Sequence, residues 1–295
     1  MSKVYFLPVG EADCFVLTLD TPEGQRNVLL DGGSLKDRRI DLADWLHGHD
    51  IHTIDLMILT HLHEDHQGAL PEVAATFPVR RAVVPVPPFG ISEKQVLAEV
   101  DGELKDRRRD LWEYDQMYHA LEAQGTVLST FYPMDELPVF RFGDYTLSCL
   151  FPLPGARSQV RDGLGDLTGL PANEINVRRK AVEKRINEES AVFLLERGQE
   201  QLVLFSGDCQ ACSIDEAMAR RPMHPRVVKL SHHGRNSETH TYYTPAQIRT
   251  LAPETVVVTY APFKSPDRHE EWAAIDPRAQ LVVTCDYPDG YILEI

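Results

Sequence analysis

The chain has 295 residues, enough for one large α/β domain with a substantial apolar core. Acidic residues outnumber Lys and Arg by 45 to 30, and the formal net charge of −15 argues against a broad electrostatic grip on duplex DNA or on an anionic membrane. No apolar run approaches the length of a membrane span, no signal peptide follows Met1, and the five cysteines form no regular framework. We therefore expect a cytoplasmic protein without membrane association.

The first part of the chain alternates short apolar runs with turns. Strands are predicted over residues 4–9, 14–19 and 27–30, and the third ends at the turn Asp31-Gly32-Gly33. Helical apolar spacing over 41–49 predicts a helix, and the apolar run 54–60 predicts a buried strand. A second helix is expected over 69–77.

Four potential metal ligands lie within six residues after the strand at 54–60, namely His61, His63, Asp65 and His66. His61 and His63 are two residues apart, so in an extended segment they point to the same side and suit one metal. Asp65 and His66 come as the chain turns into the next helix, and they suit a second metal. Mixed imidazole and carboxylate ligands favour zinc, one or two ions, with manganese or iron as alternatives. A solvated polar loop is the other interpretation, which this spacing disfavours.

The pattern His-x-His-x-Asp-His after a strand and a threonine resembles the signature of the metallo-beta-lactamase superfamily. That resemblance implies an α/β fold, the αββα four-layer sandwich, with metals at one edge of the two sheets. The opening FLPVGEADCFVLTLDTPEGQRNVLLDGG is similar to a narrower group, the metallo-beta-lactamase-like domain of the bacterial DNA-uptake channel protein ComEC and its free-standing relatives. That group typically begins with DVGQGD and then IDGG, and the first motif is altered here. Asp31 is expected to orient a metal-bound histidine, or to be a simple turn residue.

The middle of the chain is less regular. A strand is predicted over 79–86, a charged helical segment over 91–125, and a hairpin from 138–141 and 145–151. Residues 155–186 begin as a Gly- and Asp-rich loop and continue as a basic segment. We expect one domain over 1–295, with residues 155–186 inserted beside the active edge as a substrate lid. A solvated basic helix that caps the sandwich is the alternative.

Strands are predicted again over 191–196, 201–205, 227–230, 255–260, 280–284 and 291–295, with helices over 213–220 and 245–251. Asp208 follows the second of these strands and matches the superfamily position whose carboxylate bridges two metals. His232 follows the third strand and resembles the last ligand, on the second metal. We favour His232 because it is nearest the strand end, and we expect His233 to contact substrate or to transfer a proton, but the sequence does not separate the two.

One ligand of the general superfamily pattern is absent. Most members carry a histidine just before the strand that precedes the bridging aspartate, whereas residues 185–190 contain none. The first metal would then have only His61, His63 and Asp208 from the protein. Asn187 is expected to be a weak ligand, a substrate contact or a strand cap. His269 lies where the ComEC-type group usually carries a histidine, and it is a further catalytic candidate.

These residues predict a metal-dependent hydrolase, with Asp65 and His233 also candidates for proton transfer. Two cations would lower the pKa of a shared water, and the resulting hydroxide would attack phosphorus or a carbonyl carbon. The resemblance favours a phosphodiester, because ComEC-type relatives are associated with nucleic-acid degradation. The acidic charge favours a single-stranded nucleic acid or an anionic small molecule as substrate. The alternatives are hydrolysis of a lactone, amide or thioester, and a non-catalytic binding protein on a degenerate hydrolase fold.

Overall fold

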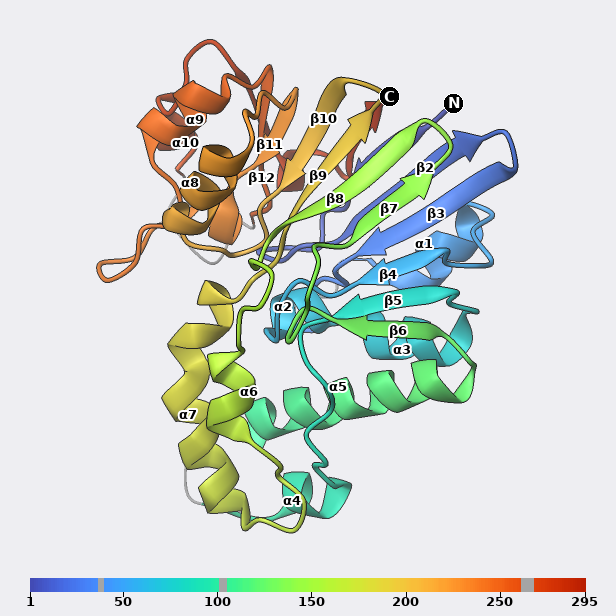
Figure 1. Cartoon of the computed structure of the whole chain (residues 1–295), viewed down its shortest axis with the longest axis vertical. Helices are drawn as coiled ribbons and strands as arrows, with labels where there is room; N and C mark the ends of the chain where they lie inside the picture. The colour runs from blue at the N-terminus through green and yellow to red at the C-terminus, as the bar shows by residue number, and fades with distance from the viewer. Residues whose placement is uncertain (37–39, 101–104, 261–267) are drawn as a thin grey trace.

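Two seven-stranded sheets pack face to face, with helices on their outer faces (Figure 1). This computed structural model describes residues 1–36, 40–100, 105–260 and 268–295. The expected αββα sandwich is confirmed. None of the helices that the structure describes has the length and apolar character needed to cross a bilayer.

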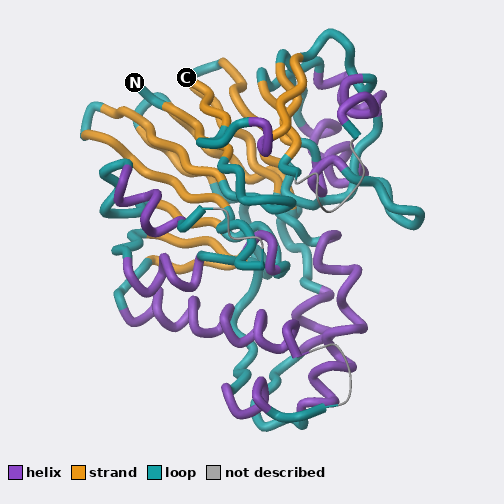
Figure 2. The backbone as a smooth tube through the Cα atoms, turned by 180° about the vertical axis from the view of Figure 1, so that it is seen from behind, coloured by secondary structure: helices purple, strands orange, loops and turns teal. Residues whose placement is uncertain are grey.

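The first sheet is built mainly from the N-terminal part of the chain. β3 to β6 run parallel, while β14, β1, β2 and β3 pair antiparallel. Because β1 pairs with β14, the two ends of the chain lie side by side (Figure 2). The spatial order is β14 (Tyr291–Glu294), β1 (Lys3–Phe6), β2 (Phe15–Thr21), β3 (Gly24–Leu30), β4 (Leu56–Ile58), β5 (Arg81–Val84) and β6 (Val127–Thr130).

The second sheet is built from the C-terminal half in the same manner, with β10 to β13 parallel and β7 to β10 antiparallel. Its spatial order is β13 (Gln280–Val283), β12 (Thr255–Val258), β11 (Val227–Lys229), β10 (Glu200–Phe205), β9 (Val192–Arg197), β8 (Tyr145–Phe151) and β7 (Val139–Phe142). Each sheet therefore contributes four parallel strands. Ligand sites in such sheets form outside the carboxyl ends of the parallel strands.

The larger apolar core lies between the sheets and continues under the helices of the first sheet. Phe15 of β2 meets Phe205 of β10 with ring centroids 5.2 Å apart, so side chains from the two sheets interdigitate. A second apolar cluster seals the other sheet against its own helices. The flanking helices are α1 (Leu42–Gly48), α3 (Leu70–Thr76) and α5 (Lys105–Ala123) on the first sheet, and α8 (Ala211–Arg220), α9 (Pro245–Leu251) and α10 (His269–Ala273) on the second.

Residues 155–186 are more helical than the sequence suggested. The Gly- and Asp-rich half contains α6 (Gln159–Leu164), which begins at Ser158, whose side chain accepts a hydrogen bond from the Arg161 N–H. The basic half is α7 (Ala172–Glu188), which packs against α6 and α5. This helical pair extends away from the sandwich (Figure 1). Its action as a lid stays a prediction.

Three local predictions differ from the structure. Asn187, expected at the start of a strand, lies in the last turn of α7, because the helix continues to Glu188 before β9 begins. The strand β6 was not predicted, since Val127-Leu-Ser-Thr is short and half polar, and it is held at the sheet edge by β5. The short helix α10 was also missed. The segment 91–125 contains α4 (Glu93–Leu97) as well as α5.

Candidate metal centre

Two groups of ligand atoms converge at the carboxyl ends of the parallel strands, and Asp208 belongs to both. Site A consists of His61, His63 and Asp208, and site B consists of Asp13, His66, Asp208 and His233. Within each group the ligand atoms all lie within 4.8 Å of one another. All of these side chains are buried except that of His63, which is partly exposed.

The loop after β4 is held in place by Asp31 at the end of β3. The carboxylate of Asp31 accepts hydrogen bonds from the Thr60 N–H and hydroxyl, both at 2.8 Å, and lies 2.8 Å from Nδ1 of His66. In the neutral ring, Nδ1 of His66 donates to Asp31, which leaves the lone pair on Nε2, the atom that faces Asp208 Oδ1 at 3.2 Å. Asp31 thus orients the His66 ring. It does so from a backbone with φ of +59°, a strained conformation for a non-glycine residue.

Close backbone contact brings this loop against the N-terminal turn. A Cβ at Gly68 would lie 2.0 Å from the carbonyl oxygen of Gly33, so only glycine lets the short helix α2 (Glu64–Gln67) end there. The Gly32 N–H donates to the His66 carbonyl at 2.6 Å, and the Asp13 N–H donates to the Asp65 carbonyl at 3.0 Å. The turns after β1 and β3 therefore meet the ligand loop after β4.

The second sheet supplies Asp208 from the end of β10. Gly207 has φ of +49° and turns the chain so that the Asp208 N–H donates to the Ser190 hydroxyl at 2.9 Å. Ser190 Oγ also lies 3.3 Å from Nδ1 of His61. One serine at the start of β9 therefore contacts a residue from each sheet. It stands in the stretch where most superfamily members place the histidine that is missing here.

The turn after β11 brings His233, rather than His232, into the centre. Both residues have left-handed backbones, with φ of +52° at His232 and +54° at His233. The His232 ring packs on Tyr242 with centroids 3.9 Å apart, and its Nδ1 contacts the Arg235 carbonyl at 2.9 Å. The geometry thus favours His233 as the ligand. We preferred His232 because it is nearest the strand end, but the 3₁₀ turn at Ser231–Gly234 places the ring of His233, and not that of His232, in site B.

The contacts of His233 define its tautomer. Thr259 at the end of β12 donates its hydroxyl hydrogen to Asp13 Oδ1 at 2.6 Å, so its oxygen accepts from the Nδ1 of His233 at 2.9 Å. This leaves Nε2 facing Asp65 Oδ2 at 3.2 Å and Asp208 Oδ2 at 3.6 Å. In the neutral ring Nε2 is therefore the atom available to a metal.

Asp13 and Lys229 belong to the site although neither was predicted to. The Lys229 side chain is fully buried, pairs with the carboxylate of Asp13, and lies 3.7 Å from Asp208 Oδ1. It also donates to the Gly207 carbonyl at 2.9 Å. The sequence contained a signal for both Asp13 and Lys229. Asp13 closes the altered opening motif, and a lone cation within the apolar run 227–230 requires a buried acid as its partner.

Burial and charge set the protonation of the two sites. Burial lowers the pKa of His61 well below its usual value and that of His63 to about 4, so both rings are neutral at pH 7. Burial also acts against the charged form of His233, but Asp208 and Asp13 outweigh it and raise its pKa to about 9. His233 and His66 in turn hold the pKa of Asp208 well below its usual range, despite burial. A cation bound at site B would displace the protons on these histidines.

The buried ligand atoms support a metal at this position. His63 Nε2, His66 Nε2 and Asp208 Oδ1 are buried and form no hydrogen bond of good geometry with the described residues, although the last two atoms face each other at 3.2 Å. Since buried polar atoms are nearly always satisfied, convergent unsatisfied atoms indicate an additional ligand. A set of imidazole nitrogens and carboxylates suits zinc, manganese or iron. The residues present therefore fit a divalent transition metal.

The remaining predicted residues lie around the centre. Asp65 is outside both groups, and its side chain remains 34% exposed while it contacts His233. The Asn187 amide donates to the Tyr242 hydroxyl at 3.3 Å, and its Oδ1 is buried without a partner in the described structure. His269 is not among the converging groups. Its ring contacts Asp286 at 3.0 Å and packs near Trp272.

Similarity to known proteins agrees with this geometry. A sequence model described as the metallo-beta-lactamase superfamily matches residues 7–96, which include Asp13, Asp31 and the ligands from His61 to His66. No curated protein sequence matches the chain.

Solved structures extend the similarity beyond the matched residues. The metallo hydrolase Igni18 of Ignicoccus hospitalis is 16% identical, with 100% of this chain and 99% of that chain covered and a TM-score of 0.52. The metallo-beta-lactamase fold protein YhfI of Bacillus subtilis is 12% identical, with both chains covered in full and a TM-score of 0.53. The diiron beta-hydroxylase CmlA of Streptomyces venezuelae is 18% identical, with 100% of this chain and 54% of that chain covered and a TM-score of 0.50. The chain therefore has the metallo-beta-lactamase fold, and its first third also carries the superfamily's sequence pattern.

Proposed function

We propose that the protein is a metal-dependent hydrolase of the metallo-beta-lactamase superfamily, of the ComEC-type group, and that it cleaves phosphodiesters. The observation that carries the proposal is the pair of convergent ligand groups that share Asp208 and contain buried atoms without partners. If these polar residues had no ligand to bind, we would expect their buried atoms to be hydrogen-bonded to other protein groups or to solvent. Two adjacent groups suit a two-metal centre, which supplies Lewis-acid activation of water and of the scissile ester when bound.

The chain's own residues would position the reactants and carry the proton. Asp31 and Thr259 hold the rings of His66 and His233 so that each directs Nε2 inward. Asp65 is the most solvent-accessible carboxylate beside the centre, and His233 helps to keep it ionised by lowering its pKa against the effect of burial. We assign to Asp65 the transfer of a proton from the attacking water towards the leaving group.

The preference for a phosphodiester rests on three features. The opening motif and the Leu230-Ser-His-His-Gly234 string resemble the ComEC-type group. A two-cation centre matches the charge that develops on a phosphoryl group. The basic helix α7 ends near the centre, because Asn187 in its last turn contacts Tyr242, which packs on His232. The basic residues of this helix would attract a substrate with negative charge to an otherwise acidic molecule.

The test is metal analysis combined with a substrate screen. We expect one or two transition-metal ions per chain, with zinc, manganese and iron each supplied during growth. Iron is included because CmlA, a structural neighbour, is a diiron protein. The metal-loaded protein should hydrolyse bis(p-nitrophenyl) phosphate and single-stranded oligonucleotides, and Asp208→Asn should abolish both activities. Absence of bound metal under all three conditions would refute the hydrolase assignment, and hydrolysis of a lactone or thioester alone would refute the substrate class.

A further inference from the structure

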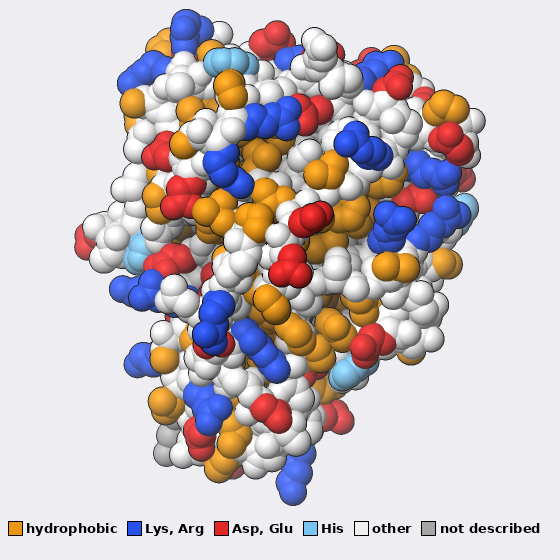
Figure 3. All heavy atoms as spheres, in the orientation of Figure 1, with side chains coloured by type: hydrophobic (Ala, Val, Ile, Leu, Met, Phe, Trp, Pro, Cys, Tyr) orange, Lys and Arg blue, Asp and Glu red, His pale blue; other side chains and the backbone are white. Residues whose placement is uncertain are grey.

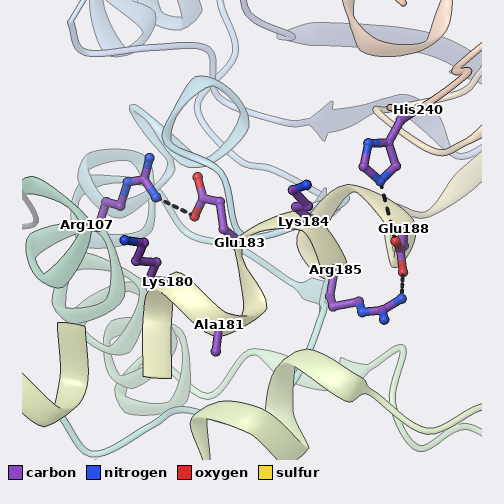
Figure 4. A pocket seen from close by; sticks show the side chains of 8 residues that line it. All are labelled: Arg107, Lys180, Ala181, Glu183, Lys184, Arg185, Glu188 and His240. Carbon is purple, nitrogen blue, oxygen red and sulfur yellow. Dashed lines mark hydrogen bonds and ion pairs between the residues drawn. The ribbon is translucent and has the colours of Figure 1, made fainter. Parts of the chain in front are cut away.

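A pocket of about 550 Å³ opens along α7 (Figure 4). Basic side chains predominate in its lining, with four from Lys and Arg against two from Glu. The lining residues are Arg107, Lys180, Ala181, Glu183, Lys184, Arg185, Glu188 and His240. In the surface view, Lys and Arg side chains gather over α6 and α7 (Figure 3). This local charge is opposite in sign to the net charge of −15 on the whole chain.

The two carboxylates of the pocket are already paired. Glu183 accepts from Arg107 at 2.9 Å and also contacts Arg179. Glu188 contacts Arg185 at 2.5 Å and lies 3.9 Å from Nε2 of His240. Dashed lines in Figure 4 join Glu183 to Arg107, and Glu188 to both Arg185 and His240.

Lys180 and Lys184 are left without a carboxylate. Neither amino group has an ion-pair partner within the described ranges of the chain, and both side chains are exposed. They are four residues apart, so they lie on the same face of α7. Two adjacent, unpaired ammonium groups in a concave surface favour an anion that contacts both.

The other cations of this helix serve the fold. Arg178 donates to the Leu164 carbonyl at 2.9 Å and to Glu174 at 2.6 Å, so it ties α7 to the end of α6. Arg179 is buried and pairs with Glu183. The unpaired positive charge of α7 is therefore concentrated at Lys180 and Lys184, and charge reversal at Arg178 or Arg179 would test the fold instead.

The same helix connects the pocket to the metal centre. His240 lines the pocket, and its ring lies 6.3 Å from that of Tyr242, centroid to centroid. Asn187, near the end of α7, donates to the Tyr242 hydroxyl, and Tyr242 packs against His232, the sequence neighbour of His233 in site B. A substrate held in the pocket would therefore extend towards the turn that carries His233.

We propose that this pocket binds a phosphate of the substrate other than the one being cleaved, and that the substrate is consequently a single-stranded oligonucleotide. The proposal rests on the proposed phosphodiesterase function. Lysine ammonium groups bind phosphates as mobile point charges, and the backbone of a nucleic acid presents such phosphates at a regular spacing. A mononucleotide or small phosphoester held only at the metal centre would make no use of the pocket.

The decisive comparison is between two charge-matched double variants. Lys180→Gln with Lys184→Gln removes the two unpaired charges of the pocket. Lys94→Gln with Arg109→Gln removes two exposed charges that do not line it. Glutamine is a good helix former, so α7 should remain intact. Both variants should keep the wild-type metal content and melting temperature.

Binding is measured first, without turnover, by fluorescence anisotropy of a labelled single-stranded oligothymidylate in the presence of a chelator. We expect the slope of log affinity against log salt concentration to fall by about 0.7 for the pocket variant, because the pocket holds one phosphate and each phosphate contact on a single strand contributes about 0.7. The control variant should keep the wild-type slope. The proposal would be overturned if the wild type and both variants had equal slopes, or if the slope fell by the same amount in both variants.

Turnover is measured second, with substrates of two lengths. The pocket variant should raise KM about tenfold for the oligonucleotide, equivalent to about 1.4 kcal/mol of binding, and leave KM for bis(p-nitrophenyl) phosphate unchanged. Equal effects on both substrates would contradict a distal phosphate site. If neither substrate is turned over by the wild-type protein, the proposed function fails, while the binding experiment still decides whether the pocket binds the strand.

Discussion

Replacement of Lys229 by methionine should strongly destabilise the metal-free protein. Lys229 is fully buried between Asp13 and Asp208, and it also satisfies the Gly207 carbonyl. Methionine preserves the unbranched apolar stem but not the charge. The two buried carboxylates would then lose their nearest permanent cation in the metal-free protein.

The size of the effect follows from the burial. Removal of one partner from a buried ion pair costs about 3–5 kcal/mol, since the remaining charge stays desolvated. We expect this loss in the free energy of unfolding of chelator-treated Lys229→Met, measured by urea denaturation at pH 7. The loss should be smaller in the metal-loaded protein, because a bound divalent cation also compensates Asp208. Lys94→Met, at an exposed site, should change stability by less than about 0.5 kcal/mol.

A double-mutant cycle isolates the contact. Asp13→Asn removes the carboxylate that Lys229 neutralises, so Asp13→Asn with Lys229→Met should be less destabilising than the sum of the two single variants, by about 1–3 kcal/mol. Additive losses would show that Lys229 does not act through Asp13. An unfolding midpoint of Lys229→Met equal to that of the wild type would refute the reasoning altogether.

Three further outcomes are expected. His233→Asn should lower the number of metal ions bound per chain, whereas His232→Asn should keep the wild-type number, because of these two rings only that of His233 lies in site B. Elemental analysis of the two variants measures this number. A larger loss of metal in His232→Asn than in His233→Asn would identify His232 as the ligand. Chelation should lower the melting temperature of the wild-type protein, and addition of zinc or manganese should restore it, because a metal that binds only the native state stabilises that state. An unchanged melting temperature after chelation would argue against a metal at this centre. Burial raises the pKa of Asp110 from the ordinary aspartate value of 3.8 to about 7, so between these pH values the native state retains a proton that the unfolded chain releases. Stability from this group is complete below pH 3.8 and declines as the pH rises through about 7, by up to about 4 kcal/mol. Asp110→Asn should reduce that decline between pH 5 and pH 8 in urea denaturation, and an unchanged profile would contradict it.

The sequence by itself determined the class of fold and the position of most ligand-bearing turns. Apolar runs of strand length ended repeatedly in Asp or His, and parallel strands place such ends along one edge of a sheet. The spacing of His61, His63 and His66 is local, so it can be interpreted without knowledge of the fold. Helix α7 was harder to predict from the sequence, because its start depends on packing against α6 and α5 rather than on a strong local pattern.

Only the tertiary structure decided which side chains meet. His232 and His233 are adjacent in sequence, and both have a left-handed backbone that the pattern of apolar residues does not predict. This turn directs the His233 ring to the centre and the His232 ring to Tyr242. Asp13 and Lys229 lie 216 positions apart and became partners only when the sheets packed together. The same holds for the basic segment, where five nearby cations look equivalent in sequence. Arg178 donates to a carbonyl of α6, and Arg179 is buried and pairs with Glu183, whereas Lys180 and Lys184 stay unpaired among the described residues. Charge and periodicity are properties of a segment, whereas pairing is a property of the neighbours that folding brings to it.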